Sequence, residues 1–377
     1  MHQRKLLKQA KMSTVNRYVR HLNPFSISIA VLILMMVGCS RDTPSLEPSS
    51  ISTDKVPGLI GSLPAYAHFS LSGMAFYGDR LYVSSNLGLL VLNNGVLETL
   101  YQWQSSDPVI EGPWLDAADD ALWIQHASNG SLSRLDASGW HRVQLPIPPS
   151  GDYSRGDVLS GFTGISSKQF FWIVGGGFAS RWQPANAQWI PEPPPPAPQS
   201  SAVRAVAPLG SSLFYVVREG LEVIPPSPYS VYNREEKWRA MPLKTMDFKQ
   251  VIATTEAVYV RASDSTLFEV TANSATPARA PGPCEAIALT STGRLIASFE
   301  GKGIFILTHD DWQQAAPYPY ESTEGEHWSR LAEKDGQIAY ATTSVPHLAG
   351  DSGKRNYSGT TALWMLQGTR LQRVPLQ

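Results

Sequence analysis

The side chains that could carry chemistry in this sequence are scattered rather than clustered. Six histidines follow residue 60, and each stands alone: His68, His126, His141, His309, His327 and His347. Among the histidines, only His309-Asp310-Asp311 gathers three potential metal ligands, and acidic residues in such a short polar stretch also favour turns. Asp116, Asp119 and Asp120 are a second acidic group, which lacks the alternating oxygen ligands of a calcium loop. The chain contains no nucleophile elbow, HExxH pair, phosphate-binding glycine loop or paired-cysteine motif. We therefore assign no catalytic residue, metal site or cofactor from the sequence.

A second group of residues suits binding rather than catalysis. It combines tyrosine with cationic side chains, which are residue types enriched at interface hot spots. The alternative is that they belong to ordinary polar loops whose prolines resist proteolysis. The candidate binding face consists of Tyr153, Arg155, Tyr318, Tyr320, His347, Arg355 and Tyr357.

The elements that must position these residues follow a repeat. Residues 114–145 read as four short strands separated by turn residues, and six further copies of this pattern occur. The centres of the second strands lie 37 to 49 residues apart. Because five aromatic residues occupy equivalent second-strand positions, we expect them in the core rather than in a ligand cage; they are Tyr82, Trp123, Trp172, Tyr215 and Tyr259.

Four strands per unit at this period predict an all-β chain that folds as a β-propeller with seven four-stranded blades. Eight blades result if residues 50–64 add a strand, and six if the fifth copy does not form a blade. The segments ASNGSLSRLDASGW and LYVSSNLGLLVL make the repeat similar to the propellers of bacterial two-component regulators. No segment remains to complete the last blade from the N-terminus, so we expect closure by side-chain packing between the first and last blades.

The departures from the repeat are where function is expected, because repeat proteins place it in insertions. In a propeller, the connections between strands two and three share a face with those that lead to the next blade. Most insertions fall on that face: residues 102–112, 146–157, 191–201, 315–327 and 342–360. Residues 225–237 are expected on the opposite face.

Three charged residues, Asp116, Arg204 and Arg330, lie on predicted first strands and are expected to face the central channel. Propeller enzymes that act on sugars or lactones commonly place several histidines or carboxylates there. Only Asp116 is of that kind. A hydrolase or lyase is therefore the less favoured hypothesis.

The N-terminus predicts export. Residues 25–37 form an apolar run behind basic residues, too short to span a bilayer but suited to a signal peptide. Met36-Val37-Gly38-Cys39 resembles a bacterial lipobox, which implies lipidation of Cys39; Ser40 implies sorting to the outer membrane, facing the periplasm. The alternative is an ordinary signal peptide or anchor with an incidental cysteine. We predict a signal peptide over residues 1–38, starting at Met1 or Met12, a tether over 39–64 and a propeller over 65–377.

The charge distribution argues against a nucleic-acid partner. Residues 39–377 contain 25 basic and 32 acidic residues, a formal charge of about −7. The leading hypothesis is a non-enzymatic, membrane-anchored, extracytoplasmic propeller that binds a protein, peptide or glycan through its insertion-rich face. A sensor module that acts through a partner is the remaining alternative. The ligand and the oligomeric state do not follow from the sequence.

Overall fold

The computed structural model describes residues 71–85, 88–102, 114–118, 120–125, 132–144, 171–175, 178–193, 195–196, 202–218, 229–234, 238–243, 247–309, 311–319, 327–344, 347–349, 354–356 and 361–374. All of them lie in the second of the chain's two units, Ser50–Gln377. The predicted signal peptide, Cys39 and the tether lie outside the described residues. Apart from strands, the described part contains one 3₁₀ turn, Pro184–Asn186, and no helix long and apolar enough to cross a bilayer.

Among the described residues the strands form eight antiparallel sheets, of which one is a two-stranded hairpin and seven are blades, numbered here 1 to 7 in chain order. Blade 1 contains β1 (Leu71–Tyr77), β2 (Arg80–Ser85), β3 (Gly88–Asn93) and β4 (Val96–Gln102). Blade 2 contains β5 (Trp114–Ala118), β6 (Ala121–Gln125), β7 (Leu132–Asp136) and β8 (Gly139–Val143). Blade 3 contains β9 (Trp172–Gly175), β10 (Phe178–Gln183) and β11 (Gln188–Glu192).

Blades 4 to 7 complete the series. Blade 4 contains β12 (Ala202–Leu209), β13 (Ser212–Arg218), β14 (Tyr229–Arg234) and β15 (Trp238–Leu243). Blade 5 contains β16 (Phe248–Ala253), β17 (Val258–Ala262), β18 (Leu267–Val270) and β19 (Ala275–Pro277). Blade 6 contains β20 (Cys284–Leu289), β21 (Leu295–Phe299), β22 (Gly303–Thr308) and β23 (Asp311–Ala316). Blade 7 contains β24 (His327–Lys334), β25 (Gln337–Ser344), β28 (Ala362–Gln367) and β29 (Arg370–Arg373), and the hairpin of β26 (His347–Ala349) and β27 (Lys354–Asn356) is inserted before β28.

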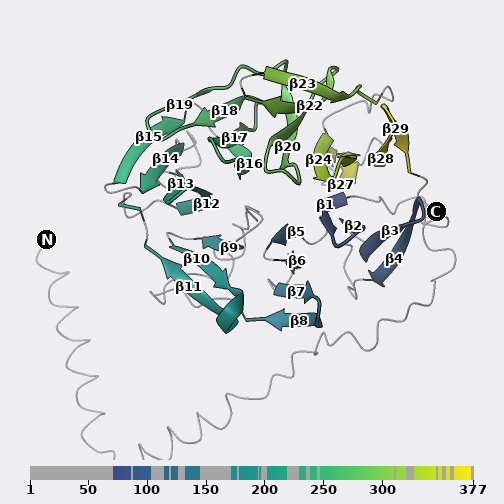
Figure 1. Cartoon of the computed structure of the whole chain (residues 1–377), viewed down its shortest axis with the longest axis horizontal. Coiled ribbons are helices and arrows are strands. Elements are labelled where there is room, and N and C mark those ends of the chain that lie inside the picture. The colour runs from purple at the N-terminus through teal and green to yellow at the C-terminus, as the bar shows by residue number, and fades with distance from the viewer. Residues whose placement is uncertain are drawn as a thin grey trace, which may run out of the picture. The chain divides into compact units, whose positions relative to one another are not determined.

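The seven blades form a ring, and in the six blades with four described strands the first strand lies toward the middle and the fourth outside (Figure 1). β1 contacts both β5 and β24, β12 contacts β16, and β20 contacts β16 and β24. Six blades show four strands among the described residues; the first strand predicted for blade 3, at residues 162–165, lies outside them. The predicted seven-bladed propeller is confirmed.

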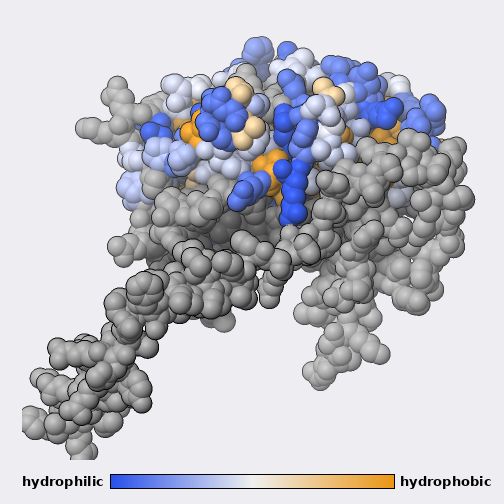
Figure 2. Space-filling view, turned by 90° about the horizontal axis from the view of Figure 1, so that it is seen from below, coloured by the Kyte–Doolittle hydropathy of each residue, from blue (hydrophilic) through white to orange (hydrophobic). Residues whose placement is uncertain are grey.

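The core lies between the blades, because each sheet is covered on both faces by its neighbours. The second strands β6, β17 and β21 are buried along their whole length. All five aromatic residues expected in the core are buried, and the ring of Trp123 stacks on Phe171 of blade 3 with centroids 4.2 Å apart. The exposed surface seen in Figure 2 is mainly hydrophilic, with small separate hydrophobic areas.

Among the described residues, no strand of blade 1 pairs within blade 7 or the reverse, and the sequence predicts closure by side-chain packing. Blade 1 consists of β1 to β4, and blade 7 consists of β24, β25, β28 and β29. Buried side chains of blade 1, such as Leu71 and Val83, pack with Ala339 and Leu363 of blade 7. Lys334 Nζ also donates hydrogen bonds to the carbonyl oxygen of Gly78 and to Asp79 Oδ1. The contact between blades 7 and 1 is therefore made by packed apolar side chains and by the hydrogen bonds of Lys334.

Two local predictions are wrong. We expect the third strand of blade 4 at residues 220–224, but β14 pairs with β13 from Tyr229 to Arg234. The long connection of blade 4 therefore joins the end of β13 at Arg218 to the start of β14 at Tyr229 rather than following the third strand, so the expectation for residues 225–237 is wrong. The sequence misleads because residues 221–224 are as apolar as a strand. Likewise, Pro191 and Glu192 end β11 rather than begin an insertion, since an outermost strand tolerates proline.

Candidate functional site

A shared irregularity of the first strands defines the candidate site. In blades 1, 4, 5 and 6, the pairing of the first strand with the second shifts by one residue near the start of the first strand. Such β-bulges re-aim side chains and are common beside functional sites. The four extra residues are Ser72, Arg204, Lys249 and Glu285, and all are polar. We call the face at which first strands begin and second strands end the loop face.

On blades 4 and 5, the bulge residue Arg204 joins a charged cluster. The hydroxyl of Tyr229 donates a hydrogen bond to Asp247 Oδ1 at 3.4 Å. Burial and the charge of Asp247 raise the pKa of Tyr229, while the nearby charges of Arg204 and Arg218 oppose that rise. Three strands and the segment before β16 thus bring two guanidinium groups, a phenol and a carboxylate together.

On blades 6 and 7, the bulge residue Glu285 accepts hydrogen bonds from two tyrosines. Its Oε1 lies 2.9 Å from the hydroxyl of Tyr318, and its Oε2 lies 2.8 Å from that of Tyr340. Ser329 Oγ lies 3.3 Å from the same Tyr340 hydroxyl. Burial, reinforced by the charge of Glu285, raises the pKa of both phenols, so that they remain hydrogen-bond donors.

Tyr318 reaches Glu285 because its chain segment crosses closely over blade 6. Gly303, at the start of β22, has a φ of +114°, and a Cβ atom there would lie 2.3 Å from the carbonyl oxygen of Ala316 and 2.9 Å from the nitrogen of Tyr318. Only glycine allows this approach. Prolines at positions 317 and 319 flank the tyrosine and restrict its backbone.

Blades 5 and 6 are connected by a side-chain amide. Gln250 Nε2 donates to the carbonyl oxygen of Ile287 at 3.2 Å, and Gln250 Oε1 accepts from the Ile287 backbone nitrogen at 3.1 Å. Arg261 Nε donates to the same Oε1 at 3.0 Å. Burial lowers the pKa of Arg261, and the charge of Glu285 counteracts this. Arg261 is therefore held below the loop face, close to Glu285.

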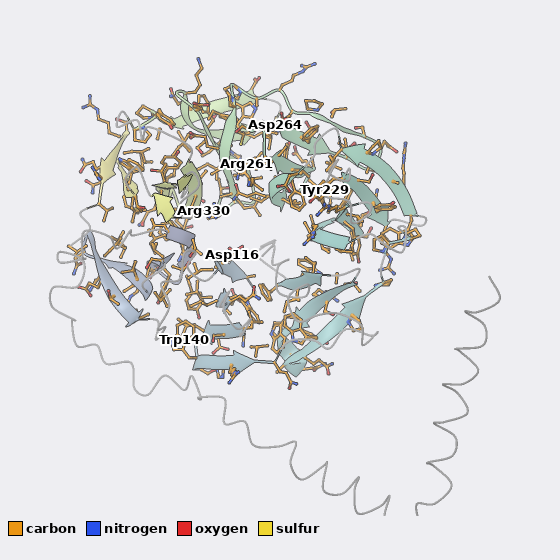
Figure 3. The ribbon with its side chains drawn as sticks, turned by 180° about the vertical axis from the view of Figure 1, so that it is seen from behind. Asp116, Trp140, Tyr229, Arg261, Asp264 and Arg330 are labelled. Carbon is orange, nitrogen blue, oxygen red and sulfur yellow. The ribbon has the colours of Figure 1, made fainter. Side chains whose placement is uncertain are left out.

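The three residues expected at the channel lie on first strands but do not form one site. Arg330 Nε donates to the carbonyl oxygen of Ser72 at 3.1 Å, so this arginine connects blade 7 to blade 1. Arg204 belongs to the Tyr229 cluster. Asp116 is half-buried in the middle of β5, and burial raises its pKa to about 7. Its Oδ1 accepts a hydrogen bond from the backbone nitrogen of Ala117 at 2.7 Å. Figure 3 shows Asp116, Arg330, Arg261 and Tyr229 on different blades around the ring.

The structure describes part of the candidate binding face. Tyr318 lies at the loop face beside Glu285. The backbone of His347 pairs with Asn356, and that of Arg355 with Leu348, in the hairpin inserted into blade 7. Tyr153, Arg155, Tyr320 and Tyr357 lie outside the described residues.

A serine, a histidine and an aspartate meet on blade 2, but not as a catalytic triad. Ser138 Oγ and Asp136 Oδ1 lie 2.8 and 3.2 Å from the same histidine atom, His141 Nε2. A triad needs the carboxylate on the other ring nitrogen. Hydrogen bonds from Ser138, above all, lower the pKa of Asp136 to about 2, which marks a well-formed turn. Within the described residues, no three histidine, cysteine or acidic side chains form a potential metal site.

Sequence reasoning missed Glu285, Arg261, Gln250 and Lys249. Each lies within or next to an apolar segment that predicts a first or second strand, so the sequence alone does not set it apart. The available signal was a polar residue at the start of a first strand in blade after blade. That signal becomes visible only when the bulges are known.

The comparisons with known proteins concern the fold. No family model and no curated protein matches the chain. Among solved structures, the chain is similar to a streptogramin B lyase, with a TM-score of 0.49 and 15% identity over 74% of this chain and 92% of that chain. It is also similar to a catalytically inactive virginiamycin B lyase from Staphylococcus aureus with quinupristin, with a TM-score of 0.48 and 15% identity over 74% and 94% of the two chains.

A third similar structure is the extracellular domain of a protein from B. thetaiotaomicron described as a one component system. The TM-score is 0.46 and the identity 12%, over 82% of this chain and 45% of that chain. These structures differ in function, and what the chain shares with them is the architecture of a β-propeller.

Proposed function

We propose that this chain is a membrane-anchored, extracytoplasmic β-propeller that binds a protein, peptide or glycan through its loop face. The observation that carries the proposal is the gathering of polar bulge residues and insertions on one face. Lys249 and Glu285 lie there with Tyr318, and the long connections of blades 4 and 7 emerge there. Rigid first strands place these side chains, so little conformational entropy is lost when a ligand binds.

The lipidated Cys39 and the tether supply the anchor in this proposal. Their support is the lipobox-like sequence at residues 36–39 and the polar composition of residues 40–62. Burial of acyl chains at about 0.8 kcal/mol per CH₂ group would hold the chain on a membrane. The tether would let the loop face turn toward partners in the same compartment.

Site-specific photo-crosslinking in the native cells tests the binding face. A benzoylphenylalanine replaces Lys249 at the loop face or, as a control on the same blade, Glu256 at the opposite face; both positions are exposed. We expect a discrete adduct, identified by mass spectrometry, from position 249 and none from position 256. Adducts only from position 256, or equal adducts from both, would overturn the proposal.

A further inference from the structure

Two hydroxyl side chains enter the interface between blades 6 and 7, whose first strands β20 and β24 lie side by side (Figure 1). Ser298 of β21 pairs with Ala286 and Ile304, and Thr342 of β25 pairs with Ala362. The three apolar partners belong to the buried cluster that these two blades share. Because directly paired residues of neighbouring strands lie on the same side of a sheet, Ser298 points toward blade 7 and Thr342 toward blade 6.

Neither hydroxyl has a hydrogen-bond partner among the residues that the structure describes. Ser298 is 0% exposed and Thr342 is 3% exposed, so neither side chain is solvated from outside. A buried hydroxyl without a partner lowers the stability of the fold, and alanine or valine would occupy the same space without that cost. Two such hydroxyls at one interface therefore point to a ligand that pairs with them.

Blade 1 shows how the fold can satisfy this position by itself. Ser84 and Ser298 correspond, because each pairs with the first residue after the bulge of its blade. Ser84 is also fully buried, but its Oγ lies 2.8 Å from Oγ of the bulge residue Ser72. In blade 6 the bulge residue is Glu285, which accepts hydrogen bonds from two tyrosines. Ser298 is thus left without the partner that its counterpart has.

Both hydroxyls adjoin a hydrogen-bonded set that we call the Glu285 cluster: Glu285, Tyr318, Ser329 and Tyr340. Ser298 pairs with the residue that follows Glu285, and Thr342 pairs with Ser329. Ser329 is fully buried, whereas Glu285 and Tyr318 are half-buried at the loop face. The polar groups therefore run from the loop face into the interface, and Tyr318 covers them from outside.

Charges of both signs act on the Glu285 cluster. Those of Glu285 and Glu300 act on Tyr318, and Arg261 of blade 5 interacts with Glu285 and Tyr340. The two carboxylates disfavour an anionic ligand, and the arginine beside Glu285 disfavours a cationic one. A neutral hydroxyl group is compatible with both, and it donates and accepts hydrogen bonds as unpaired serine and threonine hydroxyls require.

We infer that the loop face at blades 6 and 7 binds a neutral sugar of a glycan, whose hydroxyl groups pair with Ser298 and Thr342 and replace the Tyr318 hydroxyl on Glu285. Tyr318 closes the site when no ligand is bound, and its displacement opens the way to the buried hydroxyls. A site built to hydrogen-bond hydroxyl groups discriminates strongly against ligands that lack them. This inference rests on the proposed function and names the class of its ligand.

Substitutions that remove only a hydroxyl show whether the two groups are unpaired. Ser298→Ala and Thr342→Val each remove one of them, and Ser84→Ala, the matched control, removes a hydroxyl that is bonded to Ser72. We expect the urea midpoint of the first two variants to equal or exceed that of the native chain, and that of Ser84→Ala to fall. A fall in all three variants would show that Ser298 and Thr342 are already paired without a ligand, and would overturn the inference.

An array of neutral and acidic glycans tests the ligand class with the purified chain. We expect the native chain to retain neutral glycans and the double variant Ser298→Ala/Thr342→Val to bind them about tenfold more weakly, while Ser84→Ala keeps the native affinity. Tyr318→Phe should bind about threefold more tightly, because no phenol hydroxyl then competes for Glu285. Retention of acidic glycans alone or of no glycan, or unchanged binding by the double variant, would overturn the inference.

The proposed function has a separate readout in the crosslinking experiment. A discrete adduct from position 249, combined with an array that retains no glycan, would keep the proposed function and reject this inference. Adducts only from position 256 would reject the proposed function whatever the array retains.

Discussion

The hydroxyl of Tyr318 lies 2.9 Å from Oε1 of Glu285, although the two residues are 33 positions apart in the sequence. One is on the connection between blades 6 and 7, and the other is the bulge residue of β20. The contact links an insertion to the inner strands of the ring. It fixes one residue of the connection between blades 6 and 7 to the first strand of blade 6 at the loop face.

Replacement of Gly303 by alanine should dislodge Tyr318. The new Cβ would meet the backbone at Ala316 and Tyr318 within 3 Å, at a φ that alanine rarely adopts. We expect a loss of about 3 kcal/mol in the free energy of unfolding, measured with urea. Gly301→Ala is the control, because it also has a positive φ but open space around it. A loss of only about 1 kcal/mol in both variants would show that the close crossing is not required.

Loss of the Gln250 amide should loosen the contact between blades 5 and 6. Gln250→Ala leaves the Ile287 backbone and Arg261 Nε without their partner, and each unpaired buried group costs about 1–3 kcal/mol. Gln250→Glu keeps both acceptor contacts and loses only the donor to Ile287. Unfolding in urea should therefore rank the alanine variant below the glutamate variant. The reverse order would contradict the bridging role.

Asp116 should make stability depend on pH. Its pKa is raised from 3.8 to about 7 by burial, so the folded state binds more protons than the unfolded state between these values. The free energy of unfolding therefore falls as pH rises from about 4 to 7 and stays lower above pH 7. Asp116→Asn keeps the acceptor for Ala117 and removes this dependence.

Urea unfolding at pH 5 and pH 8 measures the effect. We expect the free energy of unfolding of Asp116→Asn, relative to that of the native chain, to be about 2 kcal/mol higher at pH 8 than at pH 5. This figure is smaller than the full pKa shift implies, because Asp116 is only half-buried. Asp120→Asn is the matched control, since Asp120 is exposed on the following turn. A pH profile that is the same for both variants would show that the Asp116 carboxylate is well solvated.

The seam between blades 7 and 1 should be the point at which the ring opens most readily. Leu363→Ala removes a fully buried side chain from this seam, at a cost of about 2–5 kcal/mol. We expect hydrogen exchange to rise selectively in β1 and β24. Ile173→Ala, fully buried between blades 2 and 3, removes as many carbon atoms and should not produce this local rise. A uniform rise in both variants would contradict the prediction.

The anchor is tested at Cys39. A palmitate analogue fed to cells should label the native chain and not Cys39→Ala, because the thiol is the expected attachment point. Cys284 is the control position: it is fully buried, and burial raises its pKa to about 12, so Cys284→Ser should keep the label. A label that persists in Cys39→Ala would refute the lipobox assignment.

The sequence by itself determined the repeat, and with it the seven blades and the buried second strands. Alternating apolar residues and turn residues are local signals, so Trp123 and Tyr215 could be placed in the core from their own copies. The position of β14 was mistaken for the same reason, because residues 221–224 carry the local pattern of a strand.

Only the tertiary structure decided which polar residues act together. Glu285 contacts Tyr318, and Arg330 contacts Ser72, although each pair is far apart in the sequence and no local pattern predicts the contact. The bulges at Arg204 and Lys249 depend on a one-residue shift in strand pairing, which no turn residue signals. Burial between blades, not residue type, raises the pKa of Asp116. Strand identity follows from the chain's own pattern, whereas the chemistry of the face follows from the packing of one blade on the next.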